Sequence, residues 1–249
     1  MEHPPAISLE EMIAATQDWW RDAGVDYAFE DEVQGWLKAP AEAQTARNAQ
    51  AAKVQADAEP EIEQKLGGPE ADWPHKLDAF VPFFQQAARI DGAGSRPSPP
   101  PRGNAGAELM VIVPMPEEGD TDRLLSGMQG ALLHGFLKAA GLAEERVYIV
   151  PALPHFLPMP DFDALAKQGL GELLLHHIAL ARPERVLVLG SRLPALLGHD
   201  PAHPPSRFTQ ISAKSQAMPA FACHGPEQLL LNARLRARLW HGWLDWMKA

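Results

Sequence analysis

The feature that most restricts the fold is a regular alternation of short apolar runs and helical patterns over residues 108–248. Four runs have the length and composition of buried β-strands: 108–115, 146–153, 185–191 and 218–225. Apolar residues at helical spacing fill 120–142, 161–183 and 226–248. Strands that alternate with helices form parallel sheets, because each parallel crossover needs a long connection. The sequence therefore predicts an α/β fold: a three-layer α/β/α sandwich with a central four-stranded, mainly parallel sheet.

The carboxyl ends of the predicted strands are where a site is expected, because parallel sheets bind ligands at that edge. The four ends read "VPMPEEGD", "VPALPHFLPMP", "GSRLP" and "CHGPE". The candidate catalytic residues there are Glu117, Glu118, Asp120 and His224. The candidate binding residues there are Met115, Pro116, Pro151, His155, Gly190, Ser191 and Gly225.

Ahead of the sheet, the composition predicts two further regions. Residues 1–40 read as a helical extension that contains tryptophans, with apolar residues at helical spacing from Met12 to Trp20. Residues 41–107 read as an acidic linker rich in Ala and Pro, with a helix at about 75–90 and a Gly/Pro-rich hinge before the sheet. The α/β domain is then expected over 108–249.

Three tryptophans in the first region, Trp19, Trp20 and Trp36, allow two interpretations. They either pack on the main domain or anchor a docking peptide in a pocket of a partner protein. The sequence leaves both open.

Charge and cysteine content exclude some classes of protein. The net charge is −10, and counting the sequence gives −9 for residues 1–105 (9 basic, 18 acidic) and −1 for residues 106–249 (13 basic, 14 acidic). The one cysteine excludes an internal disulfide and a metal site built from several thiolates. The first residues lack the pattern of a signal peptide, and no apolar run reaches the ~20 residues of a membrane span. We expect a soluble, cytoplasmic protein.

Over roughly 108–247 the chain resembles the uracil-DNA glycosylase superfamily, especially its bacterial iron–sulfur-type branch. The resemblance is carried by "LMVIVPMPEEGD", "GALLHGFLKAAGLAEERVYIV", "ARPERVLVLGSRLPALLG" and "HGPEQLLLNARLRARLW". In that family a base is rotated out of DNA into a pocket at the strand ends. The resemblance implies that His224 donates to the departing base and that an acidic residue of the first loop positions water.

The sequence departs from the family at several of these positions. Pro114 stands where the first loop has its acidic residue, and Pro151 stands where the second loop has asparagine. Glu117 replaces a glycine, and the His-Pro pair has become His224-Gly225. The cysteine ligands of the cluster are missing, so no iron–sulfur cluster, and no other cofactor, is expected.

Each remaining polar residue has a functional and a structural interpretation. Glu117, Glu118 and Asp120 either replace the lost carboxylate, with His155 approaching from the next loop, or cap the following helix. His224 either acts on the base or is a helix-capping or partly buried histidine. Arg234 and Arg238, which share a helix face, either contact phosphates or form a solvated surface. His176 and His177 are adjacent on a helix, point apart, and do not form a metal site.

Two functions follow. The first is a divergent uracil-DNA glycosylase-like protein of DNA repair or replication, whose eroded motifs put base excision in question. The second is a non-catalytic scaffold that binds a partner through residues 1–40. For this second function, the chain resembles the psi subunit of bacterial DNA polymerase III in the segments "DWWRDAGVDYAF" and "LLLNARLRARLW".

Overall fold

The computed structural model describes residues 9–22, 65–90, 94–200, 203, 209–214 and 216–248. The chain divides into two compact units, Met1–Glu61 and Ile62–Ala249. The first unit contains α1 (Leu9–Asp22), which agrees with the helix expected there. Trp36 and residues 41–64 of the expected linker lie outside the described residues.

The second unit is built around a sheet with strand order β2-β1-β3-β5-β4. The strands are β1 (Leu109–Val113), β2 (Val147–Pro151), β3 (Arg185–Leu189), β4 (Gln210–Ala213) and β5 (Gln216–Cys223). Four of them run parallel, with Val111 of β1 opposite Ile149 of β2 and Leu187 of β3. The predicted α/β fold is confirmed.

The predicted number of four strands is wrong, because β4 adds a fifth that pairs antiparallel with β5. In β4 exposed and buried residues alternate, and only Ile211 and Ala213 are buried. Such a strand contains no continuous apolar run, which is the signal that identified the other four. The chain turns into β5 after Lys214, whose φ of 54° is left-handed.

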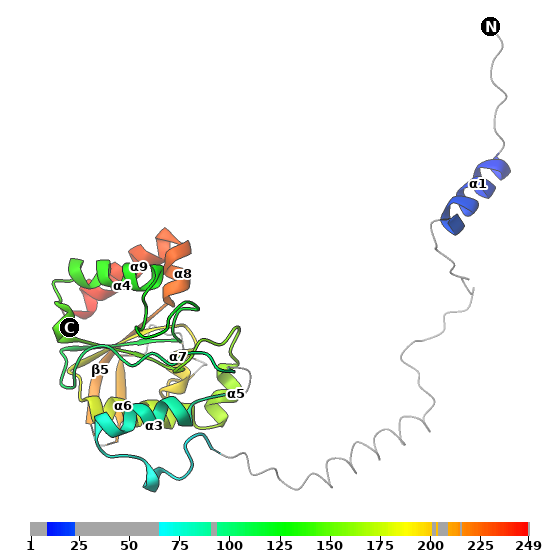
Figure 1. Cartoon of the computed structure of the whole chain (residues 1–249). Helices are drawn as coiled ribbons and strands as arrows, with labels where there is room; N and C mark the ends of the chain where they lie inside the picture. The colour runs from blue at the N-terminus through cyan, green and yellow to red at the C-terminus, as the bar shows by residue number, and fades with distance from the viewer. Residues whose placement is uncertain are drawn as a thin grey trace. The chain divides into compact units, whose positions relative to one another are not determined.

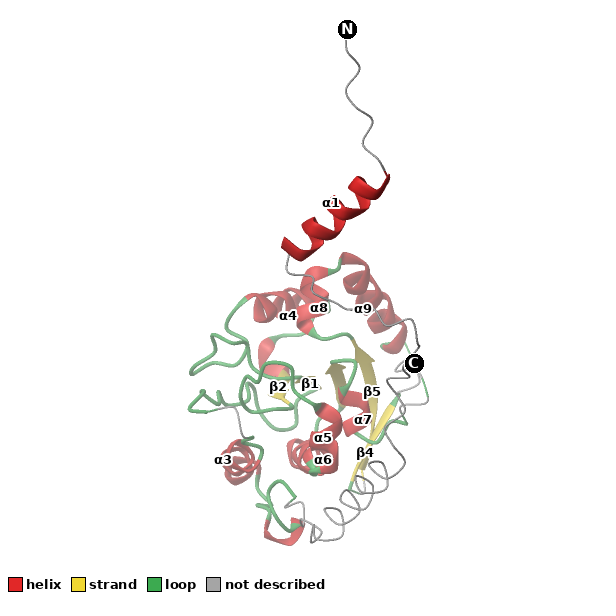
Figure 2. Ribbon diagram, turned by 90° about the vertical axis from the view of Figure 1, so that its right-hand side faces the viewer, coloured by secondary structure: helices red, strands yellow, loops and turns green. Residues whose placement is uncertain are grey.

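Helices cover both faces of the sheet (Figures 1 and 2). One face carries α4 (Met128–Ala139), α8 (Pro226–Leu231) and α9 (Ala233–Trp246). The other carries α3 (Leu77–Ala87), α5 (Phe162–Lys167), α6 (Leu170–Ala181) and α7 (Leu193–Leu196). Short 3-10 turns, η1 (Glu70–Asp72) and η2 (Glu144–Arg146), complete the elements.

The central strands are buried on both sides, as their continuous apolar sequence predicts. In β1, Leu109, Val111 and Val113 pack with the α4/α9 side. Met110 and Ile112 point to the opposite side and pack with α3 and α6. Because successive side chains of a strand alternate between its faces, one run of five apolar residues supplies both halves of the core.

The helix expected at 75–90 packs onto the sheet domain. In α3, Phe80 and Phe84 are buried, and both rings contact His177 of α6. The compact unit accordingly begins at Ile62, earlier than the residue 108 at which the α/β domain was expected. Linker-like composition on either side of this helix gave no sign that its aromatic face fills the core.

Candidate functional site

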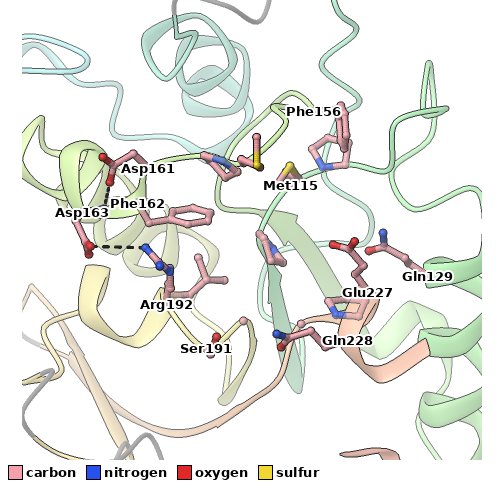
Figure 3. Close-up of a pocket in the computed structure, with 18 residues that line it drawn as sticks. Met115, Gln129, Phe156, Asp161, Phe162, Asp163, Ser191, Arg192, Glu227 and Gln228 are labelled. Carbon is pink, nitrogen blue, oxygen red and sulfur yellow. Dashed lines mark hydrogen bonds and ion pairs between the residues drawn. The ribbon is translucent and has the colours of Figure 1, made fainter. Parts of the chain in front are cut away.

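A cavity of about 680 Å³ lies at the carboxyl ends of β1, β3 and β5 (Figure 3). Its wall combines the ends of these strands with the beginnings of α5 and α8, the start of α4 and the loop after β2. The lining residues are Pro114, Met115, Pro116, Gln129, Phe156, Met159, Pro160, Asp161, Phe162, Asp163, Gly190, Ser191, Arg192, Leu193, Gly225, Pro226, Glu227 and Gln228. The volume is in the range of cavities that hold small ligands.

Backbone hydrogen bonds bring the strand ends together. The Gly190 N–H donates to the carbonyl of Cys223 at 2.9 Å, and the Leu153 N–H donates to the carbonyl of Pro114 at 2.9 Å. The close approach also requires glycine, since a Cβ on Gly190 would lie 2.9 Å from Leu193 Cγ and 3.3 Å from Pro114 Cγ. The convergence at this edge follows from the parallel order of the strands.

Five residues predicted for binding line this cavity: Met115, Pro116, Gly190, Ser191 and Gly225. They come from three separate loops, and the sequence predicted that these loops meet only through the expected parallel order of the strands. That they bind a ligand remains a prediction.

Glu117 does not line the cavity but binds the beginning of α4. Its Oε1 accepts hydrogen bonds from the N–H groups of Gly127 and Gly130, and its Oε2 accepts one from the N–H of Gln129. These N–H groups have no partner within the helix, and a carboxylate there also interacts favourably with the helix dipole. The geometry favours the capping interpretation of Glu117.

Asp120 is buried and makes four hydrogen bonds within its own loop. Its Oδ2 accepts from the N–H groups of Glu117 and Leu125, at 2.8 and 2.7 Å. Its Oδ1 accepts from the N–H and the hydroxyl of Ser126, at 2.8 and 2.6 Å. Glu118 is exposed, and neither residue lines the cavity.

His224 lies between β5 and α8, half-buried, with its Nδ1 4.0 Å from Cys223 Sγ. It does not line the cavity, although the next two residues, Gly225 and Pro226, do. The strand end is therefore placed as the sequence predicts. The imidazole of His224 itself is not part of the cavity wall.

The two predicted residues of the second loop are both buried and do not line the cavity. Pro151 ends β2 and pairs with Val113 of β1. His155 is 0% exposed, and neither of its ring nitrogens has a hydrogen-bond partner. Burial lowers the pKa of His155, and the charges of Arg89 and Arg96 lower it further, so the ring is held neutral.

Sequence reasoning missed several polar residues of the cavity wall. Glu227 belongs to the quoted loop "CHGPE". It was not predicted as a site residue, because an acidic residue is common in the first turn of a helix. Gln129 enters from α4 and Arg192 from the loop after β3, where only Gly190 and Ser191 were considered. Asp161 was hidden as a helix cap: its Oδ1 accepts from the N–H groups of Asp163 and Ala164 at 3.1 Å.

Of the basic residues of α9, Arg236 has a structural role. Its Nη1 donates to the carbonyls of Leu229 and Leu230 at 2.7 and 3.0 Å, at the end of α8. Arg234 and Arg238 are exposed, as both interpretations require. Their contact with phosphates remains a prediction.

No residue of α1 is buried. Trp19 is 62% exposed and Trp20 is 48% exposed, and their rings contact each other edge to face at 5.0 Å. Leu9, Met12 and Ile13 are also exposed. These residues give α1 an apolar side, while the docking of its tryptophans on a partner stays a prediction.

The described residues contain neither a cluster of metal-ligating side chains nor a helix that could span a membrane. No group of three or more His, Cys, Asp and Glu side chains among them is arranged to hold a metal ion. Among the same residues, no helix combines the length and apolar character that crossing a bilayer needs.

Comparison with known proteins gives one family. The family model of the Uracil DNA glycosylase superfamily matches residues 100–246. No curated protein matches the chain significantly. The matched range contains the five strands and the residues that line the cavity.

Proposed function

Since the chain belongs to the uracil DNA glycosylase superfamily, we propose that it acts in DNA repair or replication without cleaving an N-glycosidic bond. The observation that carries the proposal is the hydrogen bonding of Glu117 and Asp120, two of the three carboxylates of the first loop. The protein is then a pseudoenzyme that keeps the fold of base-excision proteins.

Hydrolysis of a glycosidic bond needs a group that positions or activates water and a donor that stabilises the departing base. Pro114 has neither an ionisable side chain nor an N–H to donate, and the same holds for Pro151. Glu117 and Asp120 could reach a substrate only by giving up seven hydrogen bonds to their own loop and to α4. These losses support a protein without hydrolytic activity.

The test is an assay for base release. The full chain is incubated with single- and double-stranded DNA containing uracil, and alkali-labile sites are counted beside an active uracil-DNA glycosylase. We expect no sites above the protein-free background. Release that disappears in His224→Ala would overturn the proposal and make His224 the donor to the base. Release that disappears in Glu227→Gln would overturn it through the cavity carboxylate.

The apolar side of α1 favours a second candidate, a scaffold that binds a replication or repair protein. Leu9, Met12 and Ile13 share one side of α1 with Trp19 and Trp20, because their spacing repeats every three or four residues. An exposed apolar side is how an amphipathic helix enters a groove of its partner. A psi-like role as a clamp-loader subunit belongs to this candidate, as does DNA contact through Arg234 and Arg238.

This candidate is tested by recovery of partners on the immobilised full chain. A buried tryptophan anchor contributes about 2 kcal/mol or more to binding, which corresponds to a roughly 30-fold loss of affinity on truncation. We expect Trp19→Ala with Trp20→Ala to abolish recovery of a replication or repair protein identified by mass spectrometry. The matched control is Asp18→Ala, which lies on the opposite side of the same helix. If the unmodified chain, the double tryptophan variant and the control variant all recover the partner equally, the scaffold function is contradicted.

A further inference from the structure

We propose that the cavity at the strand ends binds an arginine side chain presented by a partner protein. The inference extends the proposed function and depends on it in one respect: a site that performs no hydrolysis is free to hold a protein ligand. It concerns the occupant of the cavity, which lies at the strand ends where base-excising members of the family hold a rotated base.

The walls of the cavity combine polar and apolar residues, and two of the lining residues, Phe156 and Phe162, are aromatic. Phe156 and Met115 lie on one side, and the Phe162 ring lies on the side that carries α5 (Figure 3). Phe162 is buried, and Phe156 is half-buried. Such walls suit the flat, weakly hydrated guanidinium group and the methylene stem of an arginine.

The charges of the wall select a cation. Three carboxylates line the cavity, those of Asp161, Asp163 and Glu227, against one basic residue, Arg192. The sum is −2 when all four are ionised. A nucleotide strand would bring fixed negative phosphates to this rim, and like charges repel. A cationic side chain is attracted by the same arrangement.

Two contacts made by the chain's own arginines show which interactions the residues at the wall can make with a guanidinium group. The Arg96 guanidinium already lies over the Phe156 ring, with Cζ 5.1 Å from the ring centroid. At the rim, Arg192 Nη1 lies 3.6 Å from Asp163 Oδ2. Both modes of guanidinium recognition, stacking on an aromatic ring and pairing with a carboxylate, are thus present in the chain's own contacts. Glu227 has no such partner among the described ion pairs and is available to a ligand.

Met159 at the rim supplies an apolar contact for the residues beside the arginine. Its side chain is 95% exposed, and it stands between Pro158 and Pro160 with a left-handed φ of 49°. A residue other than glycine in this conformation is strained, and the flanking prolines restrict the loop that presents it. Exposed methionines adapt to varied partner surfaces.

The helix α1 of this chain is unsuited to the cavity. It carries four acidic residues and one basic residue, a net charge of −3, and would meet a wall of the same sign. Charge complementarity points instead to a segment of another protein with an exposed arginine.

The test uses the full chain and two short peptides. Acetyl-Ala-Arg-Ala-amide and its citrulline analogue, which has nearly the same shape without the charge, are titrated while backbone amide signals are followed by NMR. We expect saturable shifts at Gly190, Ser191 and Gly225 with the arginine peptide and at least tenfold weaker binding of the citrulline peptide. Binding should weaken when the NaCl concentration rises.

Variants give changes in opposite directions. Glu227→Gln should weaken binding of the arginine peptide about fivefold, the upper range for an exposed ion pair. Arg192→Gln removes the competing cation and should strengthen binding about threefold. Glu184→Gln is the matched control, because Glu184 is exposed and precedes β3 at the opposite edge of the sheet. A thermal melt of each variant verifies that it is folded.

Equal binding of the two peptides, the absence of saturable binding, or shifts at these amides with a uracil-containing oligonucleotide in place of the arginine peptide each overturn the inference. The outcome is separable from that of the proposed function. Base release that depends on His224 would reject the non-hydrolytic function, whereas the peptide titration is read without any DNA present.

Discussion

Three histidine side chains, His155, His176 and His177, are buried in the second unit and keep ring nitrogens without hydrogen-bond partners. His177 shares one hydrogen bond of 2.8 Å with the Tyr148 hydroxyl, while its Nδ1 has no partner. Burial lowers the pKa of all three, and for His177 to about 3. The folded protein therefore holds them neutral, at a cost when the solvent is acidic.

We predict that the free energy of unfolding falls as the pH drops below about 6.5. The unfolded chain binds a proton at His177 near pH 6.5, but the folded chain does so only near pH 3, so acid favours unfolding over that interval. One such histidine contributes a loss of about 1.4 kcal/mol per pH unit. Urea unfolding at pH 7.5 and 5.5 should differ less in His177→Gln, by about that amount. In the control His241→Gln, which changes an exposed histidine, the free energy of unfolding should change between pH 7.5 and 5.5 as much as in the wild type. If His177→Gln also shows the full wild-type change, the prediction is wrong.

A second prediction at this scale separates two neighbouring carboxylates. Asp120→Ala leaves the N–H groups of Glu117, Leu125 and Ser126 without their acceptor and should lower the free energy of unfolding by about 2–4 kcal/mol. Glu118→Ala, two residues away and exposed, should change it by less than about 0.5 kcal/mol. Urea unfolding of both variants measures the two free-energy changes. Equal changes would show that the hydrogen bonds of Asp120 do not stabilise this loop more than Glu118 does.

The sequence predicts residues of the cavity best where the backbone itself forms the wall. Gly190, Ser191 and Gly225 lie within two residues of a strand end, so the strand pattern places them. Glu227 and Gln129 line the same cavity from helices, and helical periodicity does not tell which strand end such a residue faces. For Glu117 the sequence offered capping of the following helix as one of two interpretations, but it did not identify Gly127, Gln129 and Gly130 as the donors, because these are fixed by tertiary contacts.

At the scale of elements, the glycines of α4 have opposite surroundings. A Cβ on Gly130 would lie 1.8 Å from the carbonyl oxygen of Leu125, whereas a Cβ on Gly135 meets nothing within 4 Å. The beginning of α4 thus packs directly against the loop that Asp120 holds together.

We predict that Gly130→Ala lowers the free energy of unfolding by more than about 2 kcal/mol, because backbone must move to relieve the overlap. Gly135→Ala in the same helix should raise it by up to about 1 kcal/mol, because alanine is the better helix former. Thermal and urea unfolding give both values. A tolerated Gly130→Ala would mean that this contact is looser than the structure has it.

The helices of the domain were predicted in the right order, but α4 begins at Met128 and not at 120, and two of the predicted helices are divided. The pattern over 226–248 predicts one helix, yet the chain breaks at Asn232, whose side chain accepts from the Arg234 N–H and begins α9. The pattern over 161–183 divides at Gly169, whose φ is 93°. Apolar periodicity continues across both breaks, so capping by a single residue decides the division.

At the scale of the whole molecule, the extent of the folding unit leads to a prediction about fragments. Trp73, Phe80 and Phe84 precede the range that the family model matches, yet they belong to the core. Truncating one buried aromatic side chain costs about 3–5 kcal/mol, and a domain is stable by about 5–15 kcal/mol.

A fragment of residues 62–249 should therefore unfold cooperatively at the Tm of the full chain, and a fragment of residues 100–249 should not. Circular dichroism melts of the two fragments and the full chain measure this. Matching melting temperatures for both fragments would show that α3 is dispensable.

The short antiparallel bridge between Arg102 and Ile149 has a consequence for how the molecule behaves at high concentration. Strand β2 ends the sheet on its side, and an uncovered outer strand is a template on which another chain can add. Arg102 exchanges both backbone hydrogen bonds with Ile149, and Gly103 lies so close to β2 that a Cβ would overlap the carbonyl of Val147. The segment before β1 thus covers part of the outer edge of β2, where another chain could otherwise pair with it and aggregate. Because the segment fits closely against β2, a residue larger than glycine at position 103 has little room.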